Sequence, residues 1–77
     1  MEMERLLDIL NELHDDIDYE TETGLVDDKL FNSFDLITLV AELSDEFDIE
    51  ITAKEFIPEN FNSAQALWRM IQELSGE

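Results

Sequence analysis

Three segments of this chain repeat apolar residues at the three- and four-residue spacing of an amphipathic helix, and this periodicity constrains the fold most strongly. The segments cover about residues 2–14, 33–47 and 63–75. Helices that each carry one apolar face become stable by burying those faces against one another. The sequence therefore predicts an all-α fold, a small four-helix bundle with three main helices and one short helix.

The apolar positions of the three segments form one face in each. In the first they are Met3, Leu6, Leu7, Leu10, Leu13 and Ile17. In the second they are Leu36, Leu39, Val40, Leu43 and Phe47. In the last they are Ala64, Leu67, Trp68, Ile71 and Leu74. Polar and acidic side chains occupy the opposite faces of the first two, which predicts that those faces meet solvent.

Capping residues predict where the helices begin and end. Asn32 suits the N-cap of the second helix, and Asp35 places a negative charge in its first turn. Gly76 is expected to end the last helix, which should begin after Asn62. The segment from Thr52 to Glu55 has the form of a capping box, so the short helix is expected there, with Pro58 stopping it.

The long segment between the first two helices has no clear periodicity. A loop of this length is uncommon in a compact domain unless its side chains hold it in place. Gly24 indicates a turn within it. Six apolar residues are expected to attach this segment to the core: Ile17, Tyr19, Leu25, Val26, Leu30 and Phe31.

Charge narrows the range of functions. The 77 residues, read as one domain over 1–77, include 21 acidic and four basic residues, for a formal net charge of −17. Nucleic acids and anionic membranes should be repelled, whereas basic protein surfaces should be attracted. No apolar run is long enough to span a membrane and no signal peptide is evident, so the expected location is the cytoplasm.

Catalytic and metal-binding signals are weak. The chain has no cysteine, and its one histidine, His14, is expected to complement the dipole at the end of the first helix. Alternating acids begin at Asp16, but Thr21 and Asp27 stand where a calcium loop needs glycine and bidentate glutamate. We expect neither an enzyme nor a specific metal site, with loose cation binding by the acidic surface left open.

The most informative segment is Asn32-Ser33-Phe34. On a helical projection Phe34 falls roughly 150° from the centre of the apolar face, with Ala41 on its side. A large apolar group that has no place in the core and borders an acidic face suits a docking contact. The neighbouring hydroxyl of Ser33 is therefore a candidate functional group.

A purely structural interpretation competes with this one. Asn-Ser is a common capping pair, and it occurs again at Asn62-Ser63 before the last helix. Two features favour the first pair as functional. Phe34 projects from the core whereas Ala64 joins a buried face, and six acidic residues but no basic ones lie between Lys29 and Lys54.

On these residues the chain resembles the acyl carrier protein family. The likeness covers nearly the whole length and is strongest from Leu25 through Ile51, where an acidic helix ends in Phe47-Asp48-Ile49-Glu50-Ile51. The family triplet, similar to Asp-Ser-Leu, here is Asn32-Ser33-Phe34, and phenylalanine in its third place is similar to the D-alanyl carrier branch and related stand-alone bacterial carriers. The family usually has aspartate at the position of Asn32. Asparagine keeps the helix cap but removes a negative charge beside the serine.

The resemblance implies a 4'-phosphopantetheine arm on Ser33, attached by a phosphopantetheinyl transferase and carrying acyl or aminoacyl groups as thioesters. The cargo stays open between a fatty acyl chain, a polyketide unit, an amino acid and D-alanine. The implied partners are a loading ligase and acyl-transfer enzymes with basic docking surfaces. The protein itself is expected to be a monomer. The implied docking residues are Asn32, Phe34, Asp35, Ala41, Glu42, Asp45 and Glu46. The alternative is a degenerate carrier, an acidic helical interaction module without a prosthetic group.

Overall fold

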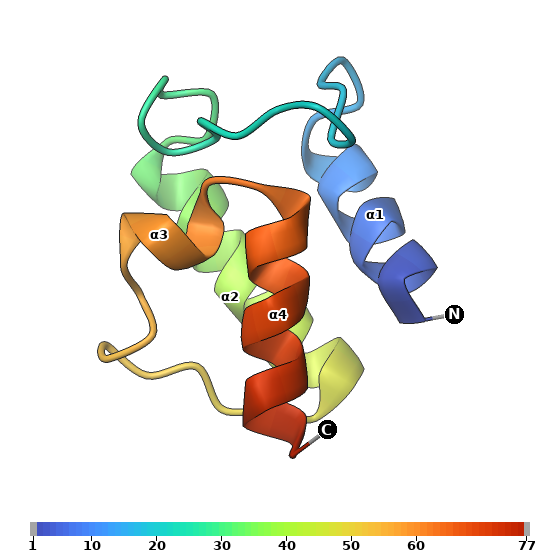
Figure 1. Ribbon diagram of the computed structural model, residues 1–77, viewed down its shortest axis with the longest axis vertical. Helices are drawn as coiled ribbons and strands as arrows, with labels where there is room; N and C mark the ends of the chain where they lie inside the picture. Colours follow the sequence, from blue (N-terminus) through green and yellow to red (C-terminus); the bar gives the residue numbers. More distant parts are fainter. Residues whose placement is uncertain (1, 77) are drawn as a thin grey trace.

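A computed structural model describes residues 2–76 and confirms the all-α fold. Four helices follow one another along the chain: α1 (Glu2–Leu13), α2 (Ser33–Phe47), α3 (Pro58–Phe61) and α4 (Ala64–Ser75). Within the described residues no β-strand forms. Figure 1 shows α4 crossing in front of α2, with α1 on one side and the short α3 on the other.

The core lies where the predicted apolar faces meet, since α1 contacts both α2 and α4, and α3 contacts α4. Leu6, Leu10, Leu39, Leu43 and Leu67 are fully buried, as the spacing predicted. Ile9, Ala66 and Met70 are also buried, although the apolar faces drawn from the sequence did not include them. The buried set is completed by Tyr19, Leu25, Phe31, Ile49, Phe61, Ala64 and Ile71.

The bounds of α2 agree with the expectation, and α1 ends one residue early, at Leu13. The backbone N–H of His14 still donates to the carbonyl of Leu10 at 2.9 Å, so the last helical bond extends to the predicted end. Gly76 ends α4 with a left-handed φ of 84°, a conformation that glycine adopts without a Cβ penalty.

The short helix is displaced from the expected position. Residues 52–55 form a turn in which the Glu55 carboxylate accepts the Thr52 N–H at 2.9 Å and the Thr52 hydroxyl at 2.6 Å. The helix α3 instead begins at Pro58, which was expected to stop it. Proline fits the first helical position because its missing N–H would have no intrahelical partner there. The prediction of a helix from Thr52 was therefore wrong.

The long loop between α1 and α2 is held by the buried side chains of Tyr19, Leu25 and Phe31, as expected. It is also fastened by Asn62, whose side-chain oxygen accepts the N–H groups of Val26 and Asp27 at 2.9 and 3.0 Å. The Asn62 amide then donates to the Asp27 carboxylate at 3.1 Å. This clasp fixes the segment that leads into α2.

None of the helices within residues 2–76 has both the length and the apolar character needed to cross a membrane.

Candidate functional site

The start of α2 is fixed by a reciprocal pair of hydrogen bonds. The Asn32 side-chain oxygen accepts the Asp35 N–H at 2.8 Å, and the Asp35 carboxylate accepts the Asn32 N–H at 3.2 Å. Together they satisfy two donors that a helix N-terminus leaves without intrahelical partners. Asn32 is thus the N-cap that the sequence predicted, and the following residue is left with no capping role.

Ser33 is the first residue of α2 and is exposed. No other group of residues 2–76 forms a hydrogen bond with its hydroxyl. Ser63 differs, because its hydroxyl oxygen accepts the Ala66 N–H at 3.0 Å and caps α4. In the second Asn-Ser pair the serine is therefore used structurally and Asn62 holds the loop, whereas in the first pair the serine is free.

Asp35 was expected to offer its charge to a partner, but its carboxylate turns inward to His14. The His14 Nε2 lies 2.8 Å from Asp35 Oδ2, and the Asp35 side chain is only 17% exposed. The hydrogen bond from His14 is the main reason that the pKa of Asp35 lies below its ordinary value, and the Asn32 N–H adds to the effect. His14 also contacts the Phe31 ring, with centroids 5.0 Å apart, so it joins α1 to the entry of α2.

An exposed apolar strip lies along α2 next to Ser33. Phe34 is 75% exposed, which confirms its predicted projection from the core, and Ala41 is exposed as well. Ile37 also belongs to this strip, although it was not predicted as a site residue, and it is 63% exposed. Its place three residues after Phe34 and four before Ala41 put it on the same helix face, and that spacing was the available signal.

The acidic residues toward the end of α2 are not equivalent. Glu42 and Asp45 are exposed, and they remain available to a partner. Glu46 forms an ion pair with Arg5 of α1, so part of its charge is neutralised within the chain. Exposed ion pairs of this type contribute little to stability and exchange readily. The free negative charge of this face is therefore centred on Glu42 and Asp45.

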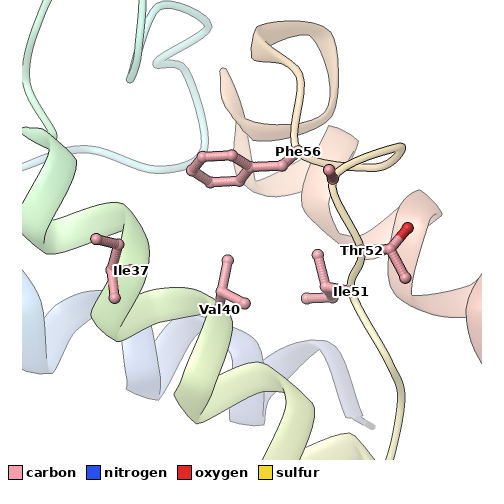
Figure 2. Close-up of a pocket in the computed structure, with 6 residues that line it drawn as sticks. Ile37, Val40, Ile51, Thr52 and Phe56 are labelled. Atoms are coloured by element: carbon pink, nitrogen blue, oxygen red, sulfur yellow. The ribbon is translucent and has the colours of Figure 1, made fainter.

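Two apolar hollows lie between α2 and the segment that leads into α3. One, of about 240 Å³, is lined by Ile37, Val40, Ile51, Thr52, Ala53 and Phe56, and Figure 2 shows these side chains in close-up. The other, of about 200 Å³, is lined by Val26, Leu36, Phe56, Ile57, Pro58 and Phe61. Phe56 and Ile57 were not predicted as site residues, although two consecutive large apolar residues before Pro58 gave a signal in the sequence.

Comparison of the chain with protein-family models, with curated proteins and with solved structures gives no match.

Proposed function

We propose that this protein is a carrier that holds acyl or aminoacyl groups on a 4'-phosphopantetheine arm attached to Ser33. The observation that carries the proposal is the exposed hydroxyl of Ser33 at the first position of α2, relieved of capping by Asn32. A phosphate ester on this oxygen would lie at a helix N-terminus, where the helix dipole favours negative charge. The cytoplasmic location proposed for the protein suits such a role.

The attachment needs an accessible hydroxyl, and Ser33 supplies one at the exposed first position of α2. In the transfer, the Ser33 oxygen forms a bond to the phosphorus of the pantetheine phosphate of coenzyme A. The bond from that phosphorus to the adenosine bisphosphate breaks, and the hydroxyl proton passes to a base of the transferase. The arm supplies the thiol that a chain without cysteine lacks.

Partner enzymes would dock along α2. The exposed side chains of Phe34, Ile37 and Ala41 supply an apolar contact. The unpaired acids Glu42 and Asp45 attract basic surfaces, and Glu46 adds to this attraction when it releases Arg5. Opposite charges at the rim of an interface raise the rate of encounter more than the affinity. That balance suits a monomeric carrier that visits a transferase, a loading ligase and acyl-transfer enzymes in turn.

Intact mass spectrometry tests the proposal. The protein is incubated with coenzyme A and a broad-specificity phosphopantetheinyl transferase, and its mass should increase by one arm. Ser33→Ala should stay unmodified, whereas Ser63→Ala, the matched control in the second Asn-Ser pair, should still gain the arm. A mass gain that persists in Ser33→Ala contradicts the assigned site.

A second candidate function is an acidic interaction module without a prosthetic group. It is favoured by one observation: Asn32 is uncharged and Asp35 is turned toward His14, so the first turn of α2 offers no free carboxylate to a transferase. Purification from the native cell distinguishes the two functions. A wholly unmodified protein in a stable complex would support the interaction module.

A further inference from the structure

His14 is fixed at the point where the end of α1 meets the start of α2. Its backbone N–H donates to the Leu10 carbonyl at 2.9 Å, and its own carbonyl accepts the Tyr19 hydroxyl at 2.7 Å. The Phe31 ring lies beside the imidazole, with centroids 5.0 Å apart. These contacts aim the imidazole at Asp35, whose Oδ2 lies 2.8 Å from the His14 Nε2.

The direction of this hydrogen bond follows from the charge of Asp35. The carboxyl group is ionised at neutral pH, since even the ordinary pKa of an aspartate, 3.8, lies far below that pH. An ionised carboxylate only accepts hydrogen bonds, so the His14 Nε2 carries a hydrogen and donates it. The same oxygen, Oδ2, also accepts the Asn32 N–H at 3.2 Å. Two donors therefore hold the carboxylate inward, and the Asp35 side chain is only 17% exposed.

The inward turn of Asp35 removes charge from the surface around Ser33. Asp35 is the acidic residue of the first turn of α2, and the next acidic residue along the helix is Glu42. The large exposed side chains in this part of α2 are Phe34 and Ile37, and both are apolar. A partner that reaches the Ser33 hydroxyl therefore meets an apolar surface, with the nearest carboxylate of α2 already engaged.

We propose that His14 determines which enzymes modify Ser33, because it withholds the carboxylate of Asp35 from a basic partner; this inference rests on the proposed carrier function. A transferase that binds the first turn of α2 through an arginine or lysine must first break the hydrogen bond from His14. A transferase with an apolar surface at this place contacts Phe34 and loses nothing. The partner selected has an apolar contact near Ser33 and basic residues opposite the C-terminal half of α2.

The test measures the kinetics of arm attachment from coenzyme A by a broad-specificity phosphopantetheinyl transferase that has a basic docking surface. His14→Ala releases the Asp35 carboxylate, so the KM for the carrier should fall severalfold while kcat stays near its wild-type value. The fall should disappear at high ionic strength, because salt screens an exposed charge. An unchanged KM in His14→Ala, or a fall that salt does not affect, would overturn the inference.

Two matched variants separate the hydrogen bond from the packing of the ring. His14→Phe keeps a ring beside Phe31 but has no donor, so it should lower the KM as His14→Ala does, and it keeps the test valid if the alanine variant unfolds. His14→Gln keeps an N–H donor and should return the KM most of the way to the wild-type value. Equal KM values in His14→Phe and His14→Gln would contradict a role for the hydrogen bond.

A double-mutant cycle identifies the charge that is released. When Asp35 is replaced in Asp35→Asn, the further change His14→Ala should leave the KM unaltered, because no carboxylate remains to be released. A fall in KM as large as that in the Asp35 background would show that another group is responsible and would overturn the inference.

Failure of the carrier function is recognised separately, because intact mass then shows that the wild type gains no arm. The role of His14 is tested in that case on the unmodified protein, with a nitroxide that carries an ammonium group and with its neutral counterpart. In His14→Ala the cationic nitroxide should increase the paramagnetic relaxation of the Ser33 and Phe34 amide signals severalfold at low salt, and the neutral one should not. Equal relaxation in wild type and His14→Ala would contradict the proposed role.

Discussion

Asn32 and Ser63 perform the same task at two different helices, although they are opposite members of the two Asn-Ser pairs. The Asn32 side-chain oxygen accepts the Asp35 N–H at 2.8 Å, and the Ser63 hydroxyl oxygen accepts the Ala66 N–H at 3.0 Å. One side-chain acceptor is sufficient to cap each helix. The other member of each pair has no capping task, so Asn62 holds the long loop and Ser33 has no hydrogen-bond partner among residues 2–76.

The cap on α2 predicts the effect of two substitutions. Asn32→Ala removes the acceptor and should lower the free energy of unfolding by about 1 kcal/mol. Asn32→Asp keeps an oxygen in the same place and should unfold near the wild-type midpoint. Urea denaturation followed by the fluorescence of Trp68, the single tryptophan, measures both. If Asn32→Asp lowered the free energy of unfolding as much as Asn32→Ala, the side-chain acceptor would not be the cause of the destabilisation.

The clasp formed by Asn62 predicts a local effect on the long loop. Asn62→Ala removes the acceptor for the Val26 and Asp27 N–H groups and should cost about 1–3 kcal/mol of stability. Amide hydrogen exchange at these two residues should accelerate more than exchange in α1. Asn62→Asp is the matched variant, since it keeps the acceptor but places a carboxylate beside Asp27. Unchanged exchange in Asn62→Ala would contradict the clasp.

The contact between His14 and Asp35 predicts a contribution to the free energy of unfolding that is lost at acid pH. The pKa of Asp35 is lowered from its ordinary 3.8 mainly by the His14 hydrogen bond. The unfolded chain therefore protonates Asp35 before the folded protein does. Its contribution should be fully present above pH 3.8 and should diminish as the pH falls through the lower value in the folded state.

Carboxyl carbon NMR titration of Asp35 measures this effect. In His14→Ala the midpoint should move up toward the ordinary value, and in Asp35→Asn the corresponding part of the acid destabilisation should disappear. The same Asp35 midpoint in wild type and His14→Ala would show that the contact does not form in solution.

Tyr19 predicts an effect at alkaline pH. Burial, followed by the negative charges of Asp16, Asp15 and Asp35, raises the pKa of its phenol from 10.0 to about 12. The stability that comes from keeping this group neutral should be present below pH 10 and should be lost as the pH rises toward 12. Phenolate absorbance reports this group alone, because the chain has one tyrosine. A midpoint near 10.0 in the folded protein would contradict the burial of Tyr19.

The parts of the fold that the sequence predicted are those with local causes. The bounds of α2 depend on a cap and on an apolar face within fifteen consecutive residues, so its extent was predictable. The short helix was misplaced because a proline can end one helix or begin another, and only the surrounding packing decides between the two. The clasp joins Asn62 to Val26 and Asp27, which precede it by 36 and 35 positions, and no local pattern indicates so distant a contact.

In the candidate site, too, features with local causes were predictable from the sequence and features set by distant contacts were not. The exposure of Phe34 followed from its angle on the helix, and Ile37 shares that helix face, whereas Phe56 lies outside any helix, so no helical pattern indicated its exposure. The inward turn of Asp35 depends on His14, 21 positions earlier in the chain. Helix geometry alone therefore identified Ser33 and Phe34 as a surface pair, but it could not identify the neighbours that set the charge and shape around them.

The most direct test of the central claim is the intact mass of the protein purified from its native cell, followed by peptide mapping. If Ser33 holds the arm, a fraction of the protein should carry one phosphopantetheine group and the modified peptide should contain Ser33. A protein that is entirely unmodified, or an arm found on any other residue, would contradict it.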